Sequence, residues 1–201
     1  KLALQTISSE MKRLYRKKRV SNKDVIAGIP IDSEYIIFII DTSGSMFRYA
    51  WPKVIKQIED TLVVYPSVKG VQILNDMGSY MFSDYQDRWI PDTPGLRKKI
   101  VEKLANWNEF SNSSPAEGIT TAIEAFYEPN RRISLYVYGD EFTGKSIREV
   151  VDYVTKINRK NKNKEPLVRI HAIGFPVMRA QPTDFQHTGI KFASLMRKLC
   201  K

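Results

Sequence analysis

The sequence has a single cysteine, Cys200, and only two histidines among its 201 residues. One cysteine excludes an internal disulfide, and it excludes most metal sites that are built from several thiolates. Long hydrophobic runs are also missing, because the longest, Tyr35–Ile40, has the length of a strand and not of a membrane span. The chain begins at Lys1 without Met or a signal-peptide pattern, so we expect a piece of a longer protein whose compartment the sequence does not fix.

Signatures of common enzymes are scarce as well. The sequence lacks the Gly-x-Ser-x-Gly and Gly-x-Gly-x-x-Gly motifs, and we do not predict a phosphate-binding P-loop. We interpret His171 as a core histidine within a strand, and we place His187 in a loop with no obvious carboxylate partner. A phosphate-transferring aspartate at Asp41 is disfavoured, because the second acid that such hydrolases carry two residues later is Ser43 here. We therefore predict that the protein is not an enzyme.

The most informative stretch is the apolar run Tyr35–Ile40 with the polar residues that follow it. A short run rich in β-branched residues is typical of a strand that is buried on both faces of a parallel sheet. In such sheets, ligands bind beyond the carboxyl ends of the strands. Asp41, Ser43 and Ser45 would place hard oxygen donors there, and such donors suit Mg²⁺, Mn²⁺ or Ca²⁺. The alternative is that the serines only cap the next helix.

Asp41-Thr42-Ser43-Gly44-Ser45 after a hydrophobic strand resembles the metal-ion-dependent adhesion site of von Willebrand factor A (vWA) domains. The resemblance covers about residues 33–200. It implies a doubly wound, Rossmann-like α/β fold with a mainly parallel central sheet, one antiparallel edge strand and a Mg²⁺ site at the top of the sheet. In that family the metal takes an acidic side chain from a protein partner, so the resemblance implies a partner that presents Asp or Glu.

The other metal ligands of the family match this sequence less closely. Counting along the family's second hydroxyl loop gives Ser113, with Ser114 as the next candidate, although Ser113 could instead cap the helix that begins at Pro115. The third part of the family's site is an acid, here Asp140 in Gly139-Asp140-Glu141, where the family usually reads Thr-Asp-Gly, and Glu141 is an alternative ligand. The resemblance thus implies one shared ion, Mg²⁺ or else Mn²⁺ or Ca²⁺, that is held by Asp41, Ser43, Ser45, Ser113 and Asp140.

Strand-like and helix-like segments alternate along the rest of the chain, which favours a parallel sheet with right-handed crossovers. Strands are predicted over residues 35–40, 71–74, 133–138 and 167–175, the last as another central strand, with 79–82 as a short antiparallel edge strand. Helices are predicted over residues 2–19, about 50–65, 94–107, 115–126, 146–158 and 188–200. A complete vWA domain adds a final strand after its last helix, and we expect that strand to be missing from this chain.

Positive charge is concentrated near the start of the chain. The net charge is +10, and residues 1–24 hold eight basic and two acidic residues. We predict a basic helix and linker over residues 1–30, followed by a C-terminally truncated vWA domain over 31–201. A second basic run covers residues 158–164, but neither run interleaves the aromatic residues that nucleic-acid stacking requires, so solvated surfaces are favoured.

Three functions remain open from the sequence. The first is a metal-dependent protein-binding module that grips an acidic side chain of its partner. The second is a regulatory or scaffold subunit of a larger complex, with or without metal, and the third is nucleic-acid binding through the basic segments. We predict no small-molecule substrate, and membrane contact only through parts of the parent protein outside this sequence. An ion held mostly by hydroxyls should bind weakly until the partner's carboxylate completes its shell.

Overall fold

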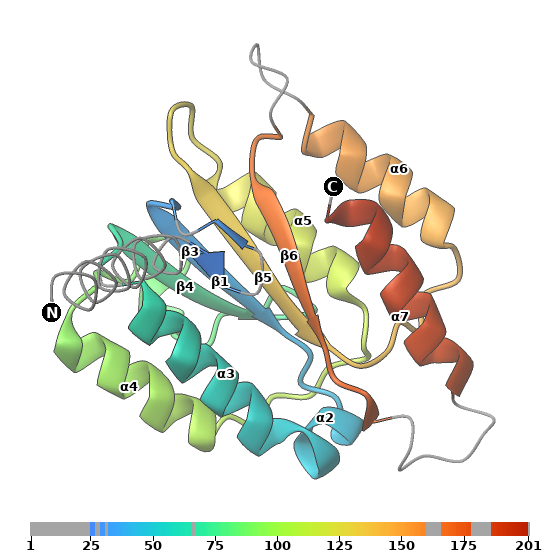
Figure 1. Ribbon diagram of the computed structural model, residues 1–201, viewed down its shortest axis with the longest axis horizontal. Coiled ribbons are helices and arrows are strands. Elements are labelled where there is room, and N and C mark those ends of the chain that lie inside the picture. The colour runs from blue at the N-terminus through green and yellow to red at the C-terminus, as the bar shows by residue number, and fades with distance from the viewer. Residues whose placement is uncertain are drawn as a thin grey trace, which may run out of the picture.

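The computed structural model describes residues 32–65, 67–159, 166–177 and 186–200, together with two short strands at 25–26 and 29–30. Four parallel strands form one sheet in the order β4-β3-β5-β6 (Figure 1). These strands are β3 (Tyr35–Ile40), β4 (Gly70–Asn75), β5 (Ile133–Gly139) and β6 (Arg169–Gly174). In the predicted linker, β1 (Val25–Ile26) pairs antiparallel with β2 (Ile29–Pro30). The predicted helix over residues 2–19 lies outside the described residues.

Helices cover both faces of the sheet (Figure 1). They are α2 (Gly44–Tyr49), α3 (Trp51–Val64), α4 (Pro94–Ala105), α5 (Pro115–Phe126), α6 (Ile147–Ile157) and α7 (Gln186–Leu199), with a short 3₁₀ turn, η1, at Ser83–Tyr85. α3 and α4 pack on one face, whereas α5, α6 and α7 pack on the other. None of the described helices is long and apolar enough to cross a membrane.

The alternation of side chains along β3 explains why the sheet is covered twice. Ile36, Phe38 and Ile40 pack in the core cluster with α3 and α4. Ile37 and Ile39 pack in the cluster with α5, α6 and α7. Because successive strand residues point to opposite faces, a fully apolar strand requires a hydrophobic layer on each side. The predicted doubly wound α/β architecture is confirmed.

Local signals set where several helices begin. Thr93 accepts a hydrogen bond from the Leu96 N–H at the start of α4 (3.2 Å), and Ser146 accepts one from the Glu149 N–H at the start of α6 (3.2 Å). Both are ordinary N-caps. The helix predicted from about residue 50 begins earlier, as α2 at Gly44, and is interrupted before α3. Ser43 and Ser45 therefore lie at a helix start and not in a longer loop.

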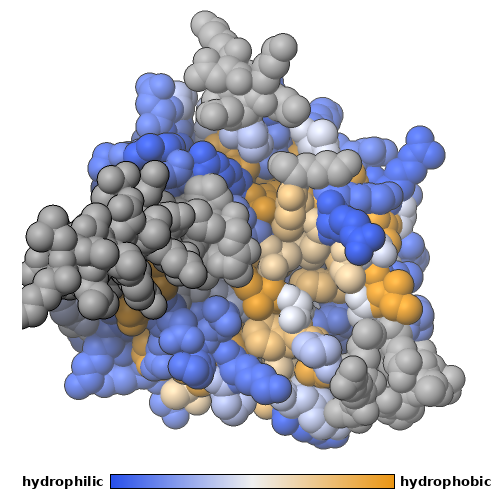
Figure 2. Space-filling model, viewed as in Figure 1, coloured by the Kyte–Doolittle hydropathy of each residue, from blue (hydrophilic) through white to orange (hydrophobic). Residues whose placement is uncertain are grey.

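β6 was predicted as a central strand and is instead an edge strand of the described sheet. Among the described strands it pairs with β5 alone, and of its six residues only Ile170 is buried. Figure 2 shows hydrophobic residues gathered over β6 and toward α7 on the face in view. A short apolar run indicates that a strand is covered by hydrophobic layers on both faces, but it does not indicate whether the strand has one neighbouring strand or two. That is why its sequence resembles that of a central strand.

The predicted antiparallel edge is present in reduced form. Residues 79–82 form no strand, but Tyr80 makes a single antiparallel bridge with Leu74, and Ile90 makes another with Val71. The turn before Tyr80 depends on Gly78, whose φ of +89° favours glycine. The edge beside β4 is therefore antiparallel, as predicted, but is limited to single bridges.

The two histidines occupy different elements. His171 on β6 is half-buried, its ring centroid lies 5.0 Å from that of Tyr136, and its Nε2 lies 3.3 Å from Ser134 Oγ. Burial lowers the pKa of His171 to about 4. His187 was predicted in a loop but lies in the first turn of α7.

Candidate functional site

Three neighbouring strands end in an acidic residue at the same edge of the sheet. Asp41 follows β3, Asp76 follows β4, and Asp140 follows β5. Ile40 is in register with the last residue of β4, and the Asp76 N–H donates to the Ile40 carbonyl (3.0 Å), so Asp41 and Asp76 stand side by side. None of the three acids exposes more than 4% of its surface. The carboxyl edge of the sheet is therefore a buried cluster of carboxylates.

Asp41 lies at the centre of this cluster. Its Oδ1 accepts hydrogen bonds from the Ser43 N–H (2.8 Å) and the Ser111 hydroxyl (3.4 Å), whereas its Oδ2 is buried without a hydrogen-bond partner. Burial raises the pKa of Asp41 well above its usual range, and the neighbouring carboxylates of Asp76 and Asp140 raise that pKa further. Asp41 is thus an acid at a position where its ionised form is energetically unfavourable.

Ser43, Ser45 and Asp140 lie beside Asp41, as the sequence predicts. The hydroxyls of Ser43 and Ser45 are 3.0 Å apart, and the side chain of Ser43 makes no capping hydrogen bond with α2. Both carboxylate oxygens of Asp140 are buried without a hydrogen-bond partner. Burial raises the pKa of Asp140 to about 6, although the Ser45 hydroxyl acts in the opposite direction. The structure therefore brings together four of the five predicted metal-site residues.

The fifth predicted residue, Ser113, is placed differently. Its hydroxyl donates to Glu141 Oε1 (3.3 Å), and its φ is +58°, which is unusual for a residue other than glycine. The hydroxyl that contacts Asp41 belongs to Ser111, two residues earlier. Glu141 also accepts a hydrogen bond from the Thr188 hydroxyl through Oε2 (2.8 Å), so it links the Ser113 loop to α7. Both oxygens of Glu141 have protein partners.

Asp76 is the site residue that the sequence reasoning missed. Asn75-Asp76-Met77-Gly78 has typical turn composition, which gives no sign that Asp76 belongs to a site. In the structure Asp76 is fully buried, its Oδ2 accepts the Ser114 N–H (2.8 Å), and its Oδ1 has no hydrogen-bond partner. The signal that could have found it is an acid directly after an apolar strand, the same signal that identified Asp41 and Asp140.

Unpartnered oxygen atoms are the clearest property of this site. They belong to Asp41, Asp76, Asp140 and Thr42, and all are buried. Buried polar atoms without hydrogen bonds are rare and costly, whereas carboxylate and hydroxyl oxygens are the ligands that hard divalent cations prefer. Among the described residues, no three His, Cys, Asp or Glu side chains lie close enough to hold a metal together. These residues fit a cation that takes part of its shell from hydroxyls and water.

No protein-family model and no curated protein matches the sequence. Among solved structures, a von Willebrand factor type A protein from Catenulispora acidiphila has a TM-score of 0.43 and 11% identity over 82% of this chain. BatB, a conserved hypothetical protein from Bacteroides thetaiotaomicron, has a TM-score of 0.40 and 9% identity over 81% of this chain. The chain spans 43% of the first of these chains and 98% of the second.

One further motif, beside this acidic site, was missed at the sequence level. Gly139–Ser146 reads Gly-x-x-x-x-Gly-Lys-Ser and connects β5 to α6, the context of a phosphate-binding P-loop. The loop is not shaped as a phosphate cradle, because the Phe142 N–H donates to the Thr188 carbonyl (3.0 Å) and the Thr143 N–H to the Ser113 carbonyl (3.1 Å). Two N–H groups that a cradle would turn toward phosphate are thus engaged with neighbouring segments.

Several exposed hydrophobic side chains lie close in sequence to residues of this acidic site. Among the described residues, six large hydrophobic side chains are exposed, and four of them are close in sequence to residues of the site. Tyr49 follows Ser45 on α2, Met77 follows Asp76, and Phe110 precedes Ser111. Ile190 lies two residues after Thr188, which bonds to Glu141. Aromatic residues and methionine are enriched at protein–protein interfaces.

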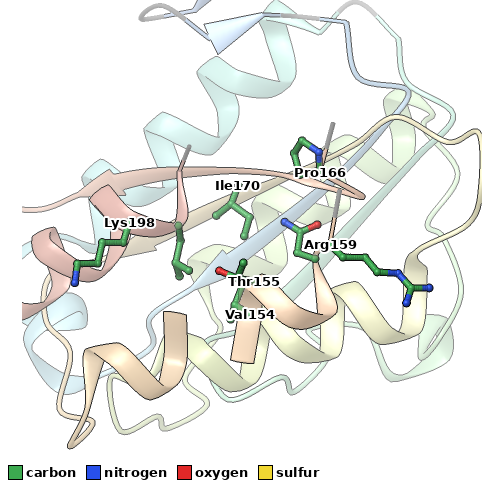
Figure 3. Close-up of a pocket in the computed structure, with 8 residues that line it drawn as sticks. Val154, Thr155, Arg159, Pro166, Ile170 and Lys198 are labelled. Carbon is green, nitrogen blue, oxygen red and sulfur yellow. The ribbon is translucent and has the colours of Figure 1, made fainter. Parts of the chain in front are cut away.

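A separate pocket of about 250 Å³ lies between α6, α7 and the start of β6 (Figure 3). Its lining residues are Val154, Thr155, Asn158, Arg159, Pro166, Ile170, Lys198 and Leu199. None of the acids or serines of the acidic site is among them. Ile170 is the second residue of β6, so this pocket is at the amino end of that strand and the acids are at the carboxyl ends.

Proposed function

We propose that the protein is a divalent-cation-dependent protein-binding module, in which an ion at the carboxyl edge of the sheet grips an acidic side chain of a partner. The observation that carries this proposal is the group of buried, unpartnered oxygens on Asp41, Asp76, Asp140 and Thr42. A divalent cation would satisfy these oxygens and offset the repulsion between the acids. Without it, the fold bears the full cost of burying them.

The residues divide into two roles toward the ion. Asp41 and Asp140 supply negative charge, whereas Ser43 and Ser45 supply neutral hydroxyl oxygens. A further hydroxyl comes from the loop 111–114, where Ser111 contacts Asp41 and Ser113 contacts Glu141. Mg²⁺ is the expected ion, with Mn²⁺ and Ca²⁺ as alternatives. A bound cation supplies a site that attracts an outside carboxylate.

The exposed hydrophobic side chains support a protein as the partner. Tyr49, Met77, Phe110 and Ile190 expose 40%, 44%, 77% and 62% of their surface. Aromatic and apolar side chains are frequent anchors of protein–protein interfaces once a partner covers them. A partner with an acidic side chain that is flanked by apolar residues would match both features.

A metal-free scaffold is the second candidate function. It is favoured by the direction of the acid pKa values, since burial raises the pKa of Asp41, Asp76 and Asp140. Protons on these acids would satisfy part of the cluster in place of a cation. In this case the same surface would bind its partner without divalent metal.

Peptide binding with and without metal tests the proposed function. A fluorescent peptide that presents one Glu between Leu and Phe residues is titrated with the chain in Mg²⁺ and then in chelator. We expect binding in Mg²⁺, a loss of at least tenfold in chelator, and a similar loss when the Glu is replaced by Gln. Binding of equal affinity in Mg²⁺ and in chelator would support the metal-free scaffold. Equal affinity for the Glu and Gln peptides would contradict the proposal that the ion binds an acidic side chain of the partner.

A further inference from the structure

The pocket between α6, α7 and the start of β6 has an apolar interior (Figure 3). Val154, Ile170 and Leu199 contribute buried apolar side chains, one from each of these elements. The Asn158 amide also lines the pocket, but its oxygen accepts the Val168 N–H (2.9 Å) and its nitrogen donates to the Val168 carbonyl (3.0 Å). Among the described residues, none of the buried side-chain atoms without a hydrogen bond belongs to the pocket lining. The interior therefore suits an apolar group.

Two cationic side chains border this apolar interior. Figure 3 shows Arg159 and Lys198 on opposite sides of the pocket, and both line it. Within the described part of the chain, neither of them forms an ion pair. Arg159 follows the end of α6 and Lys198 lies in the last turn of α7, where positive charge is favourable. Stabilisation of the helix ends accounts for each charge singly, but it does not account for the pocket between them.

The second basic run of the sequence adjoins the same pocket. The two described residues that flank residues 160–165 are Arg159 and Pro166, and both line the pocket. Residues 156–165 hold five basic residues and a single acid, Glu165. Residues 160–165 are lysines, asparagines and one glutamate, and such residues are rarely buried in an apolar environment. The run thus brings positive charge to the pocket but no apolar side chain that would fill it.

We propose that this pocket binds a small anionic amphiphile, with an apolar chain in the interior and a carboxylate at the mouth beside Arg159 and Lys198. The pocket volume of about 250 Å³ corresponds to about eight groups of the size of a water molecule, at ~30 Å³ each, so an acyl chain of about eight carbons fits. A carboxylate forms charge-assisted hydrogen bonds with arginine and lysine. The pocket is at the amino end of β6, away from the acids, so the inference does not depend on the proposed function.

Two substitutions test the interior and the charge separately. Thr155 lines the pocket from an exposed position on α6, so Thr155→Trp fills the pocket without removing a core side chain, and Thr155→Ser is its control. Lys198→Gln removes one of the two cations. Lys191→Gln is the matched control for this change, because Lys191 is two turns earlier on α7 and does not line the pocket.

The test is titration of the 201-residue chain with octanoate, followed by NMR, in the presence of chelator. We expect wild type and both control variants to bind octanoate, with shifts of the backbone amides of Val154, Ile170 and Leu199. Thr155→Trp should bind at least tenfold more weakly, because the apolar chain loses its cavity. Lys198→Gln should bind at least threefold more weakly, and octanol should bind wild type at least fivefold more weakly than octanoate does.

Four outcomes would overturn the inference. The first is no binding of octanoate by wild type at millimolar concentration. The second is equal affinity for octanol and octanoate, since Arg159 and Lys198 would then only stabilise the helix ends. The third is unchanged octanoate affinity in Thr155→Trp, which would place the binding elsewhere on the molecule. The fourth is equal sedimentation of wild type and Thr155→Trp with anionic phospholipid vesicles without octanoate binding, which would assign the basic run to membrane contact.

Discussion

At the scale of single residues, the site is defined by acids that the protein buries without satisfying them. Asp41, Asp76 and Asp140 follow three adjacent strands, and each keeps at least one oxygen without a partner. Such groups cost stability, so they are expected where a ligand or a function compensates for them. The serines around them differ in what they contact, and this difference leads to the first prediction.

Ser111→Ala should weaken cation binding more than Ser113→Ala does. The Ser111 hydroxyl contacts Asp41, whereas the Ser113 hydroxyl contacts Glu141. Loss of one hydrogen-bonding hydroxyl is worth about 1 kcal/mol, which is roughly fivefold in affinity. Mn²⁺ titration of the two variants checks this. If Ser113→Ala has the larger effect, the family count from the sequence identifies the ligand better than the structure does.

His171 gives a pH-dependent prediction away from the site. Its pKa falls from a usual 6.5 to about 4 in the folded protein, because burial disfavours the charged form. The unfolded chain therefore binds the proton more readily, and the contribution of neutral His171 to stability is complete above pH 6.5 and is lost as the pH falls toward 4. After allowance for its partial exposure, we expect wild type to lose about 1 kcal/mol more than His171→Gln between pH 7.5 and 5.

Urea unfolding at the two pH values measures this difference. Comparison with His171→Gln removes the contribution of the acid cluster, which titrates in both proteins. Equal losses in wild type and His171→Gln would contradict this, because they would mean that folding does not change the pKa of His171.

At the scale of elements, the site is formed where α5 closes against the end of β4. Gly118 on α5 allows this contact, since a Cβ there would lie 2.7 Å from the Asn75 carbonyl oxygen and 2.8 Å from the Ile39 side chain. The Gly118 N–H also donates to the Asp76 carbonyl. The helix start, the loop 111–114 and Asp76 are therefore held together by one close approach.

Gly118→Ala should destabilise the fold by about 2 kcal/mol, because backbone atoms on β4 cannot move aside easily. Gly95→Ala is the matched control, since nothing lies within 4 Å of a Cβ at that position of α4. It should be neutral or slightly stabilising. Urea unfolding of both variants tests the packing, and a neutral Gly118→Ala would show that α5 can shift without cost.

The sequence predicted the elements whose signals are local, and it missed features that depend on neighbours. β3 and β5 were predicted from continuous apolar runs, and α4 from its Pro94 start and its apolar spacing. The edge position of β6 depends on the number of paired strands, which its own residues do not encode. Asp76 was missed because its neighbours have the composition of a turn. Ser111 was missed because the family pattern picks a hydroxyl residue by its spacing along the sequence, whereas the path of the loop decides which hydroxyl contacts Asp41.

At the scale of the whole molecule, a strongly basic chain encloses an acidic site. The net charge is +10, and eight of the basic residues lie within residues 1–24, outside the described part of the chain. Charges more than about 8 Å apart are largely screened at physiological salt, so the local acids and not the net charge govern binding of an ion. The likeness to vWA structures concerns the fold. Metal dependence has to be tested by binding.

The most direct test of the account is a calorimetric titration of Mg²⁺ and of Mn²⁺ into wild type and into Asp41→Ala. Circular dichroism first confirms that both proteins are folded, and Asp60→Ala serves as the control for loss of an exposed acid. The account predicts one bound ion per chain in wild type and in the control, and an affinity at least a hundredfold lower in Asp41→Ala. Identical titrations of wild type and Asp41→Ala would contradict it and would identify a metal-free scaffold.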